Sequence, residues 1–210
     1  MSNRSGFGES TAVILSIRSK LAYIFDVKKL THDQIAELRL DVGAIPDKKR
    51  LPVAVIVDNI RSLYNVGSIF RTSDGALIQK LILTGYTPQP PRKEIEKTAL
   101  GATKSIPWEY VASPHTALDA LRSDGYRICC LELTTESVPY FSIRKADFPL
   151  CLILGNEING VSKELLAQCD LGFEIPMFGT KQSLNVAVAY GIAVFELSRI
   201  WRGAQSNARV

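Results

Sequence analysis

The sequence predicts an α/β domain, in which a mostly parallel sheet is flanked by helices. The first observation is the run PVAVIVD, which starts at Pro52 and is apolar and β-branched without polar alternation. A strand that is buried on both faces of a parallel sheet has this pattern. The second observation is the alternation of strand-like and helix-like segments along residues 51–203. Such alternation is typical of parallel strands joined by helices.

The first 50 residues differ from the rest and are predicted to form a helical N-terminal extension. Residues 1–10 are polar and are expected to be disordered. Helices are expected near residues 12–25 and 31–41, the second after Thr31 as a candidate N-cap. GAIPDKKRLP has the composition of a linker into the main domain, residues 51–203, and residues 204–210 are expected to be a flexible tail.

The first half of the main domain is expected to hold three strands and two helices. A strand from Val53 precedes a helix over residues 66–77 and the strand KLILTG. The proline-rich segment YTPQPPRKEIEKTALGATKSIP is expected to be a long loop, and WEYVAS a short strand. A helix then begins at Ser113 and Pro114 and ends at Gly125.

The second half continues the alternation and ends in a long helix. YRICCLEL, PLCLILG and LGFEIP are predicted strands, and Ser162 caps a helix between the last two. SLNVAVAYGIAVFELSRIWRG is the predicted final helix, with Ser183 as its N-cap. Because this helix is apolar around most of its circumference, we expect it to be buried in a core or at a subunit interface.

Composition narrows the class of protein. With 210 residues, 46% of them hydrophobic, the chain can bury one sizeable core, and its net charge of +4 weakly favours a polyanionic partner. The four cysteines form no CxxC pair and there are two histidines, so we expect buried thiols and no metal. The chain shows no apolar signal segment and no run of membrane-spanning length, which predicts a cytoplasmic protein without membrane association.

Three polar or glycine-containing stretches follow predicted strands, where open α/β sheets bind their ligands. They are NVGSIFRT, GNEINGVS and IPMFGTKQSLNVA. Each alone also fits an ordinary turn, a solvated arginine or a helix cap. The absence of GxGxxG after the first strand counts against a nucleotide-binding enzyme of Rossmann type.

Taken together, NVGSIFRT, LILGNEINGVS and IPMFGTKQSLNVAVAYGIAVFEL resemble the three ordered motifs of the SpoU–TrmH family of RNA 2′-O-ribose methyltransferases, within the SPOUT superfamily. KTALGATKSIPWEY resembles the segment between the first two motifs, so the likeness spans residues 53–201. It implies an α/β fold with a C-terminal trefoil knot, a topology that general rules of chain connection would not predict. It also implies S-adenosylmethionine as the cofactor, an RNA substrate and a homodimer.

The resemblance implies a methyl-transfer site and gives a role to several of its residues. Arg71 would lie at the ribose, bind the adjacent phosphate and stabilise developing alkoxide charge. Because a guanidinium stays protonated in proteins, the destination of the hydroxyl proton stays open. Glu157 would pair with the knot loops or the RNA-facing arginine. The implied catalytic residues are Asn65, Arg71, Glu157, Ser183 and Asn185.

The implied cofactor site is an apolar slot with close backbone contacts. Backbone groups near Ile175 and Leu184 would bind the adenine, and Gly155 would permit close approach. The end of the LILTG strand would form another wall. The implied cofactor-binding residues are Thr84, Gly85, Leu154, Gly155, Asn156, Gly160, Ile175, Pro176, Met177 and Leu184. One departure from the family pattern is Ala187, where serine is common.

Two functions remain open at this stage. One is a methyltransferase acting on tRNA or rRNA, and the other is a catalytically silent RNA-binding dimer of the same fold. The five intact catalytic positions favour the enzyme. Basic residues near 48–50 and 92–104 would contact RNA phosphates, which position RNA without selecting a sequence, or would form a solvated face.

Overall fold

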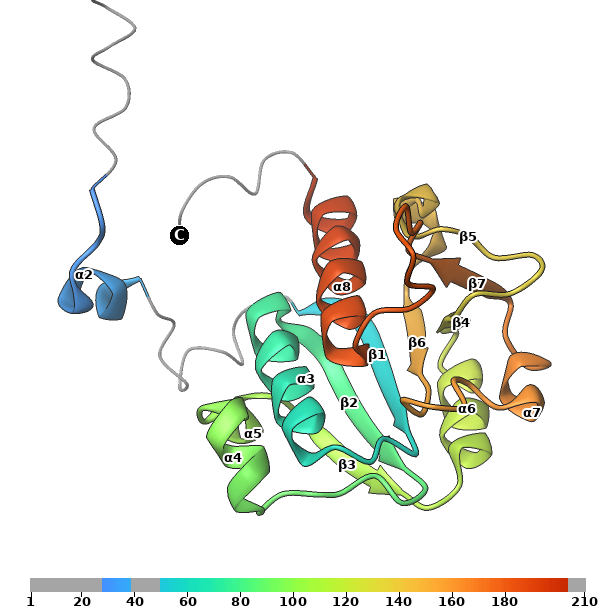
Figure 1. Cartoon of the computed structure of the whole chain (residues 1–210), viewed down its shortest axis with the longest axis horizontal. Helices are drawn as coiled ribbons and strands as arrows, with labels where there is room; N and C mark the ends of the chain where they lie inside the picture. The colour runs from blue at the N-terminus through green and yellow to red at the C-terminus, as the bar shows by residue number, and fades with distance from the viewer. Residues whose placement is uncertain (1–27, 39–49, 204–210) are drawn as a thin grey trace, which may run out of the picture. The chain divides into compact units, whose positions relative to one another are not determined.

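The computed structural model describes residues 28–38 and 50–203 (Figure 1). The chain divides into two compact units, the first containing α2 (His32–Glu37) and the second all elements from β1 to α8. Thr31 caps α2 as predicted, because its Oγ1 accepts a hydrogen bond from Gln34 N while Gln34 Oε1 accepts one from Thr31 N. The predictions for residues 1–25 and the tail, and for the linker up to residue 49, concern segments outside the described residues. The last two residues of the predicted linker, Leu51 and Pro52, are instead the start of β1, so the linker prediction is wrong there.

Over residues 50–203, seven strands form one sheet with the order β3-β2-β1-β6-β4-β7-β5. Every neighbouring pair is parallel, which confirms the predicted sheet type. The carboxyl ends of the strands therefore share one edge. The strands are β1 (Leu51–Asp58), β2 (Ile78–Thr84), β3 (Trp108–Val111), β4 (Arg127–Leu131), β5 (Val138–Pro139), β6 (Leu150–Leu154) and β7 (Leu171–Glu174).

Helices cover both faces of the sheet. Alternate residues of β1 point to opposite faces: Val55 belongs to a core with α3 and α8, and Ile56 to a core with α6 and α7. On the first face α3 and α8 lie side by side (Figure 1), joined by a buried 2.8 Å hydrogen bond between the hydroxyls of Ser73 and Tyr190. The helices are α3 (Leu63–Ala76), α4 (Lys93–Ala99), α5 (Ala102–Ser105), α6 (Pro114–Ser123), α7 (Lys163–Leu166) and α8 (Val186–Arg202), with 3-10 turns η2 (Tyr140–Ser142) and η3 (Lys145–Asp147).

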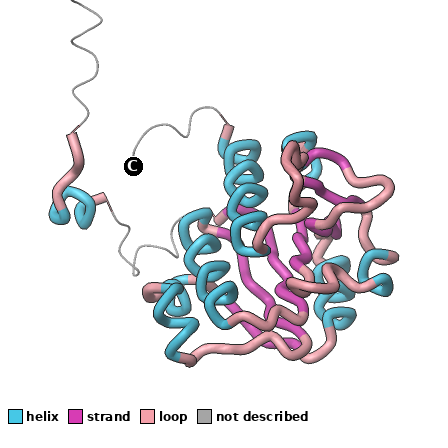
Figure 2. Tube along the Cα trace, viewed as in Figure 1, coloured by secondary structure: helices cyan, strands magenta, loops and turns pink. Residues whose placement is uncertain are grey.

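The final helix begins later than predicted. Its N-cap is Asn185, whose Oδ1 accepts hydrogen bonds from Ala187 N and Val188 N, so the assignment of Ser183 as N-cap is wrong. Asparagine and serine are equally good N-caps, and tertiary contacts of Asn185 decide between them. Residues 175–185 form a long segment without helix or strand that leads from β7 into α8 (Figure 2).

The segment predicted as a long loop contains two helices. In α4, Ile95 and Ala99 are four residues apart and buried, which is the pattern of a helix packed on one face. The partner is α3: a Cβ at Gly67 would lie 2.0 Å from Thr98 Oγ1 and 2.3 Å from Ile95 O. Gly67 therefore permits backbone contact between α3 and α4. Sequence analysis did not detect this short helical pattern, because the prolines just before it indicated a loop.

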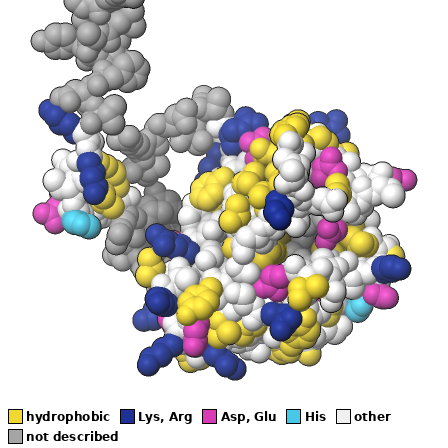
Figure 3. Space-filling view, in the orientation of Figure 1, with side chains coloured by type: hydrophobic (Ala, Val, Ile, Leu, Met, Phe, Trp, Pro, Cys, Tyr) yellow, Lys and Arg dark blue, Asp and Glu magenta, His cyan; other side chains and the backbone are white. Residues whose placement is uncertain are grey.

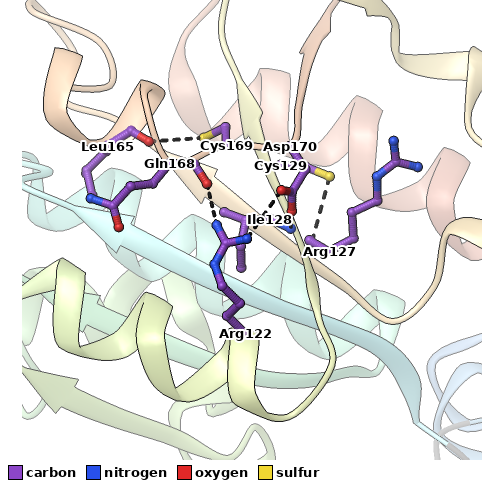
Figure 4. Close-up of polar contacts among 8 residues, drawn as sticks. All are labelled: Arg122, Arg127, Ile128, Cys129, Leu165, Gln168, Cys169 and Asp170. Atoms are coloured by element: carbon purple, nitrogen blue, oxygen red, sulfur yellow. Dashed lines mark hydrogen bonds and ion pairs between the residues drawn. The ribbon is translucent and has the colours of Figure 1, made fainter.

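Asp170 fixes the entry into β7 (Figure 4). Its Oδ2 accepts a 2.8 Å hydrogen bond from Ile128 N, and its Oδ1 lies 3.3 Å from Arg122 Nη1. Arg122 Nη2 also donates to Gln168 O at 2.6 Å. These contacts join the segment before β7 to α6 and β4, and so set the position of the residues that follow β7. None of the helices in the described part of the chain has the length and apolarity to cross a membrane.

Candidate active site

A cavity of about 810 Å³ opens at the carboxyl ends of β4, β6 and β7. Its volume lies within the range of sites that hold small cofactors. The structure brings together most of the residues that the sequence singled out, because the segments after β6 and β7 supply its walls. The predicted residues that line it are Gly155, Asn156, Glu157, Gly160, Ile175, Pro176, Met177, Ser183, Leu184 and Asn185.

A chain of hydrogen bonds joins the three sequence motifs at this cavity. Asn65 Nδ2 donates to Glu157 Oε1 at 3.0 Å, and Asn185 Nδ2 donates to Asn65 Oδ1 at 3.0 Å. Asn185 Oδ1 in turn accepts from the first amides of α8. The first motif therefore stands between the second and the third.

The donor and acceptor roles in this series of hydrogen bonds are determined by the groups at its two ends. An ionised carboxylate at Glu157 only accepts hydrogen bonds, so the amide nitrogen of Asn65 must face it. The backbone amides at the start of α8 only donate, so the oxygen of Asn185 must face them and its nitrogen must face Asn65. Each amide group thus has one satisfied orientation, which makes the link between α3 and α8 specific.

Glu157 also binds the backbone just before α3. Its Oε2 accepts from Arg61 N at 2.9 Å and its Oε1 from Ser62 N at 3.0 Å. Partial burial alone would raise the pKa of Glu157, but the hydrogen bonds from Arg61, Ser62 and Asn65 together outweigh it and lower that pKa. The carboxylate is therefore held in its ionised form near neutral pH.

Asn156 anchors the loop after β6. Its side chain is buried, and Nδ2 donates to Asn59 O at 2.8 Å and to the Tyr86 hydroxyl at 2.9 Å. Its Oδ1 accepts from the amides of Ile158 and Asn159. All of the amide's main hydrogen-bonding positions are thus used, which ties this loop to the carboxyl ends of β1 and β2.

The two glycines of this loop are required by close packing. A Cβ at Gly155 would lie 2.3 Å from the backbone carbon of Gly160. Gly160 has a φ of +66°, and a Cβ there would lie 2.2 Å from Glu132 Oε2. A side chain at Gly155 would therefore meet backbone and force the loop open, whereas one at Gly160 would be strained by the positive φ and would displace the carboxylate of Glu132.

Sequence analysis missed the wall that follows β4. Leu131, Glu132 and Leu133 line the cavity, and Glu132 Oε2 accepts a 3.0 Å hydrogen bond from Val161 N. This carboxylate joins the end of β4 to the loop after β6. The available signal was the change from apolar to polar residues after CCL, at the carboxyl end of a predicted strand.

Five predicted site residues do not line this cavity. Asn65 is one of them, and it is connected to the cavity through its hydrogen bonds with Glu157 and Asn185. Thr84 is buried and its Oγ1 donates to Asp58 Oδ1 at 2.7 Å, while Gly85 follows it at the end of β2. Leu154 is buried in the core. The side chain of Arg71 is exposed on α3 and makes no hydrogen bond or ion pair with any residue that the structure describes.

The four cysteines are free thiols, and Cys129, Cys130 and Cys151 are buried. Burial raises the pKa of Cys129 to about 12. Within residues 28–38 and 50–203, no three His, Cys, Asp or Glu side chains are grouped as a metal site would require.

Comparison with known proteins identifies the family. Residues 52–195 match the model of the SpoU rRNA Methylase family. The chain belongs to this family. Among the relatives of this SpoU-family chain, a tRNA (guanosine(18)-2′-O)-methyltransferase of Aquifex aeolicus is 34% identical over 156 residues, 73% of this chain and 72% of the relative. A Staphylococcus haemolyticus protein described as a TrmH-family tRNA/rRNA methyltransferase is 29% identical over 77% of this chain and 64% of its own length.

Solved structures show the same relationship for the SpoU-family chain. The Aquifex aeolicus TrmH/SpoU tRNA modifying enzyme superposes with a TM-score of 0.69 at 30% identity, covering 79% of this chain and 82% of that one. An AdoMet-bound rRNA methyltransferase from Sinorhizobium meliloti superposes with a TM-score of 0.66 at 31% identity, covering 72% of this chain and 60% of that one. This chain thus spans about three fifths of the length of some relatives.

Proposed function

We propose that this protein transfers the methyl group of S-adenosylmethionine to the ribose 2′-hydroxyl of a nucleotide in tRNA or rRNA. The observation that carries this proposal is the series of hydrogen bonds through Glu157, Asn65 and Asn185, which joins the first family motif to the second and third, the two that line the cavity. The Aquifex relative supports the 2′-oxygen as acceptor through its name, and the Sinorhizobium structure supports the cofactor.

The chemistry of the cavity fits S-adenosylmethionine, which supplies an activated methyl group on a positively charged sulfur. Ile175, Met177 and Leu184 offer apolar surface for an adenine. The wall also carries the carboxylates of Glu132, Glu157 and Glu174 against a single lysine, Lys181. This excess of negative charge suits a cofactor that carries sulfonium and ammonium groups.

The protein's own task in such a reaction is placement. Alignment of the attacking oxygen with the methyl carbon lowers much of the activation barrier, and electrostatic stabilisation of the oxygen lowers it further. In this proposal Arg71 binds the phosphate beside the target ribose, and Ser183 and Asn185 border the transfer site. Glu157 acts on Asn65 and on the start of α3, and so holds the first motif in place.

A homodimer belongs to the same proposal, because Arg71 does not line the cavity of its own chain. On α8, Val188 and Phe195 are each 52% exposed and share one face with Ile192, which leaves an apolar strip uncovered. A Cβ at Gly75, four residues after Arg71 on α3, would lie 3.4 Å from Phe195 Cζ. A second copy packed on this strip would bring Arg71 of one protomer toward the cavity of the other.

The trefoil knot and a cytoplasmic location complete the proposal. Support for a knotted path comes from membership of the family. The loop after β6 would belong to the knot, and it binds the chain near Asn59, Arg61 and Glu132 through hydrogen bonds of 2.8–3.0 Å. The extension before residue 51 is proposed to contact RNA as a small helical arm.

Methyl transfer from labelled S-adenosylmethionine into unmodified tRNA, and separately rRNA, tests the proposal. A 2′-O-methyl group blocks alkaline cleavage at its own ribose, so label is expected in alkali-resistant dinucleotides from one of the two RNAs. Label in mononucleotides would place the methyl group on a base and overturn the acceptor. Absence of label from both RNAs, with the cofactor bound, would favour a silent RNA-binding protein.

The Arg71→Ala variant tests the site assignment in the same assay. Transfer is expected to fall by at least about a hundredfold, because an electrostatic contact at the reacting oxygen is lost. Affinity for S-adenosylmethionine, measured by calorimetry, is expected to stay within about twofold, since one weak contact is the most that could change. An equal loss of both quantities would contradict the proposed role of Arg71.

A further inference from the structure

We propose that RNA phosphates dock on a basic face formed by the approach to α3 and by α4 and α5. We call it the α4 basic face. The choice of RNA as the ligand rests on the proposed function, whereas the location rests on the charges described below. Figure 3 shows Lys and Arg side chains gathered over the α4–α5 corner of the molecule, at lower left. The α4 basic face comprises Arg61, Arg92, Lys93, Lys97 and Lys104.

The five side chains of the α4 basic face are exposed, and none makes a hydrogen bond or ion pair with the described residues. Most other cations of the sheet domain are engaged. Lys80 binds Glu109, Arg122 binds Asp170, Arg127 and Arg144 bind Asp147, and Arg199 binds Glu196. Unpaired cations can bind a phosphate without first breaking an internal ion pair. A polyanion therefore binds this face without that cost in free energy.

The acidic groups beside this face are fewer than its five cations, so an excess of positive charge remains although each carboxylate keeps its own charge. They are Glu94, Glu96 and Asp74. Both carboxylate oxygens of Glu96 accept 3.0 Å hydrogen bonds from Thr103 Oγ1, which also joins α5 to α4. Asp74 accepts a hydrogen bond from Ser105 Oγ. Of the two carboxylates of α4, Glu94 is exposed among the basic residues and Glu96 is half-buried. The excess of positive charge is therefore maintained along the surface.

The α4 basic face is connected to the cavity by direct contacts. Thr98 Oγ1 donates to Tyr64 O at 3.1 Å, and the backbone contact at Gly67 holds α4 against the first half of α3. At the same end of α3, Arg61 N donates to Glu157, which lines the cavity. An RNA strand held on α4 would thus extend toward the proposed transfer site.

Two exposed tyrosines suit a single-stranded segment at this end. Tyr64 is 51% exposed and Tyr86 is 60% exposed. The hydroxyl of Tyr86 accepts a hydrogen bond from Asn156 Nδ2, so its ring is held near the loop after β6. Aromatic rings beside a track of cations are the usual surface for unpaired bases and their phosphates.

Charge reversal with a matched control tests this inference. Lys97→Glu on α4 is compared with Lys163→Glu on α7, because both lysines are exposed, helical and unpaired. A Lys93→Glu/Lys97→Glu double variant enlarges the effect. Binding of an unmodified tRNA transcript and of an rRNA fragment is measured by fluorescence anisotropy from about 50 to about 200 mM salt. Calorimetry with S-adenosylmethionine and circular dichroism monitor the cavity and the fold.

The double variant is expected to bind RNA at least about tenfold more weakly, and its salt dependence is expected to fall by about 1.5 in log–log slope. The RNA affinity of Lys163→Glu is expected to equal that of the wild type, and the affinity for S-adenosylmethionine is expected to stay unchanged in all variants. RNA affinity that falls equally in the α7 control, or that persists in the double variant, overturns the α4 basic face. RNA binding that maps to this face without methyl transfer supports the face and contradicts the proposed function instead.

Discussion

Asn185 Nδ2 and Asn65 Oδ1 are joined by a hydrogen bond of 3.0 Å, although 120 positions separate the two residues. The bond connects the N-cap of α8 to the first turn of α3, and Asn65 passes the connection on to Glu157. Changes at either asparagine therefore test the assembly of the site.

Substitutions at Asn185 should separate helix capping from site assembly. An aspartate retains an oxygen for the α8 amides, but it offers no donor to Asn65. Asn185→Asp is therefore expected to keep nearly the wild-type thermal stability and lose at least about tenfold in cofactor affinity. Asn185→Ala should lose both, with about 1 kcal/mol less stability. Thermal denaturation and calorimetry measure the two effects, and equal behaviour of the variants would contradict the orientation argument.

Stability should depend on pH through Glu157. Its folded-state pKa is lowered, so its contribution is fully present above the unfolded-state value of about 4.3 and is lost as pH falls through the folded value. Glu157→Gln lacks this titration. The stability difference between wild type and Glu157→Gln, measured by urea unfolding, is expected to be largest near neutral pH and to shrink below about pH 4. A difference that grows in acid would disprove the assigned direction.

Gly67→Ala should disturb the packing of α4 on α3. The added Cβ would meet Ile95 O at 2.3 Å, and backbone cannot rotate away as a side chain can. A loss of about 1–3 kcal/mol is expected, together with weaker RNA binding if α4 carries the phosphate contacts. Gly75→Ala on the same helix is the control, since its Cβ would have ordinary contact with Phe195 Cζ at 3.4 Å. Comparable destabilisation of both variants in thermal denaturation would argue against the close contact.

Thiol reactivity should report on the core. The thiolate is the reactive form, and burial raises the pKa of Cys129 to about 12 and also raises that of Cys151. In the folded protein these two cysteines are expected to resist a thiol reagent up to about pH 9, and in denaturant all four cysteines should react. Rapid modification of Cys129 or Cys151 under native conditions, located by mass spectrometry, would show that β4 and β6 are more accessible than the structure indicates.

Sequence analysis predicted the parallel sheet because six of its seven described strands, all but β5, carry their own signal. In β1, both alternating sets of side chains are apolar, so the residues of the strand themselves indicate that both of its faces are buried. The same holds for the cap of α7, where Ser162 Oγ accepts from Leu165 N as expected. The resemblance to a family then indicated that the three motifs act together, which no single motif indicates by itself.

The position of the α8 cap and of the cavity walls depended on contacts between distant segments. Ser183 and Asn185 are equivalent as local caps, and the bond to Asn65 favours the second. The resemblance implied Thr84 at the cofactor wall; β2 lies on the far side of β1 from β6, and Thr84 is not in the lining of this cavity. Glu132 lines the cavity, because β4 lies between β6 and β7.

The sequence by itself therefore determined six of the seven described strands, all but β5, and which family the three motifs resemble. These properties follow from local patterns of burial, capping and motif. Only the tertiary structure decided which strand ends meet at one cavity and that Arg71 lies outside the lining of its own chain's cavity. Strand order is set by the packing of the whole sheet and its helices, and no local pattern of residues encodes it.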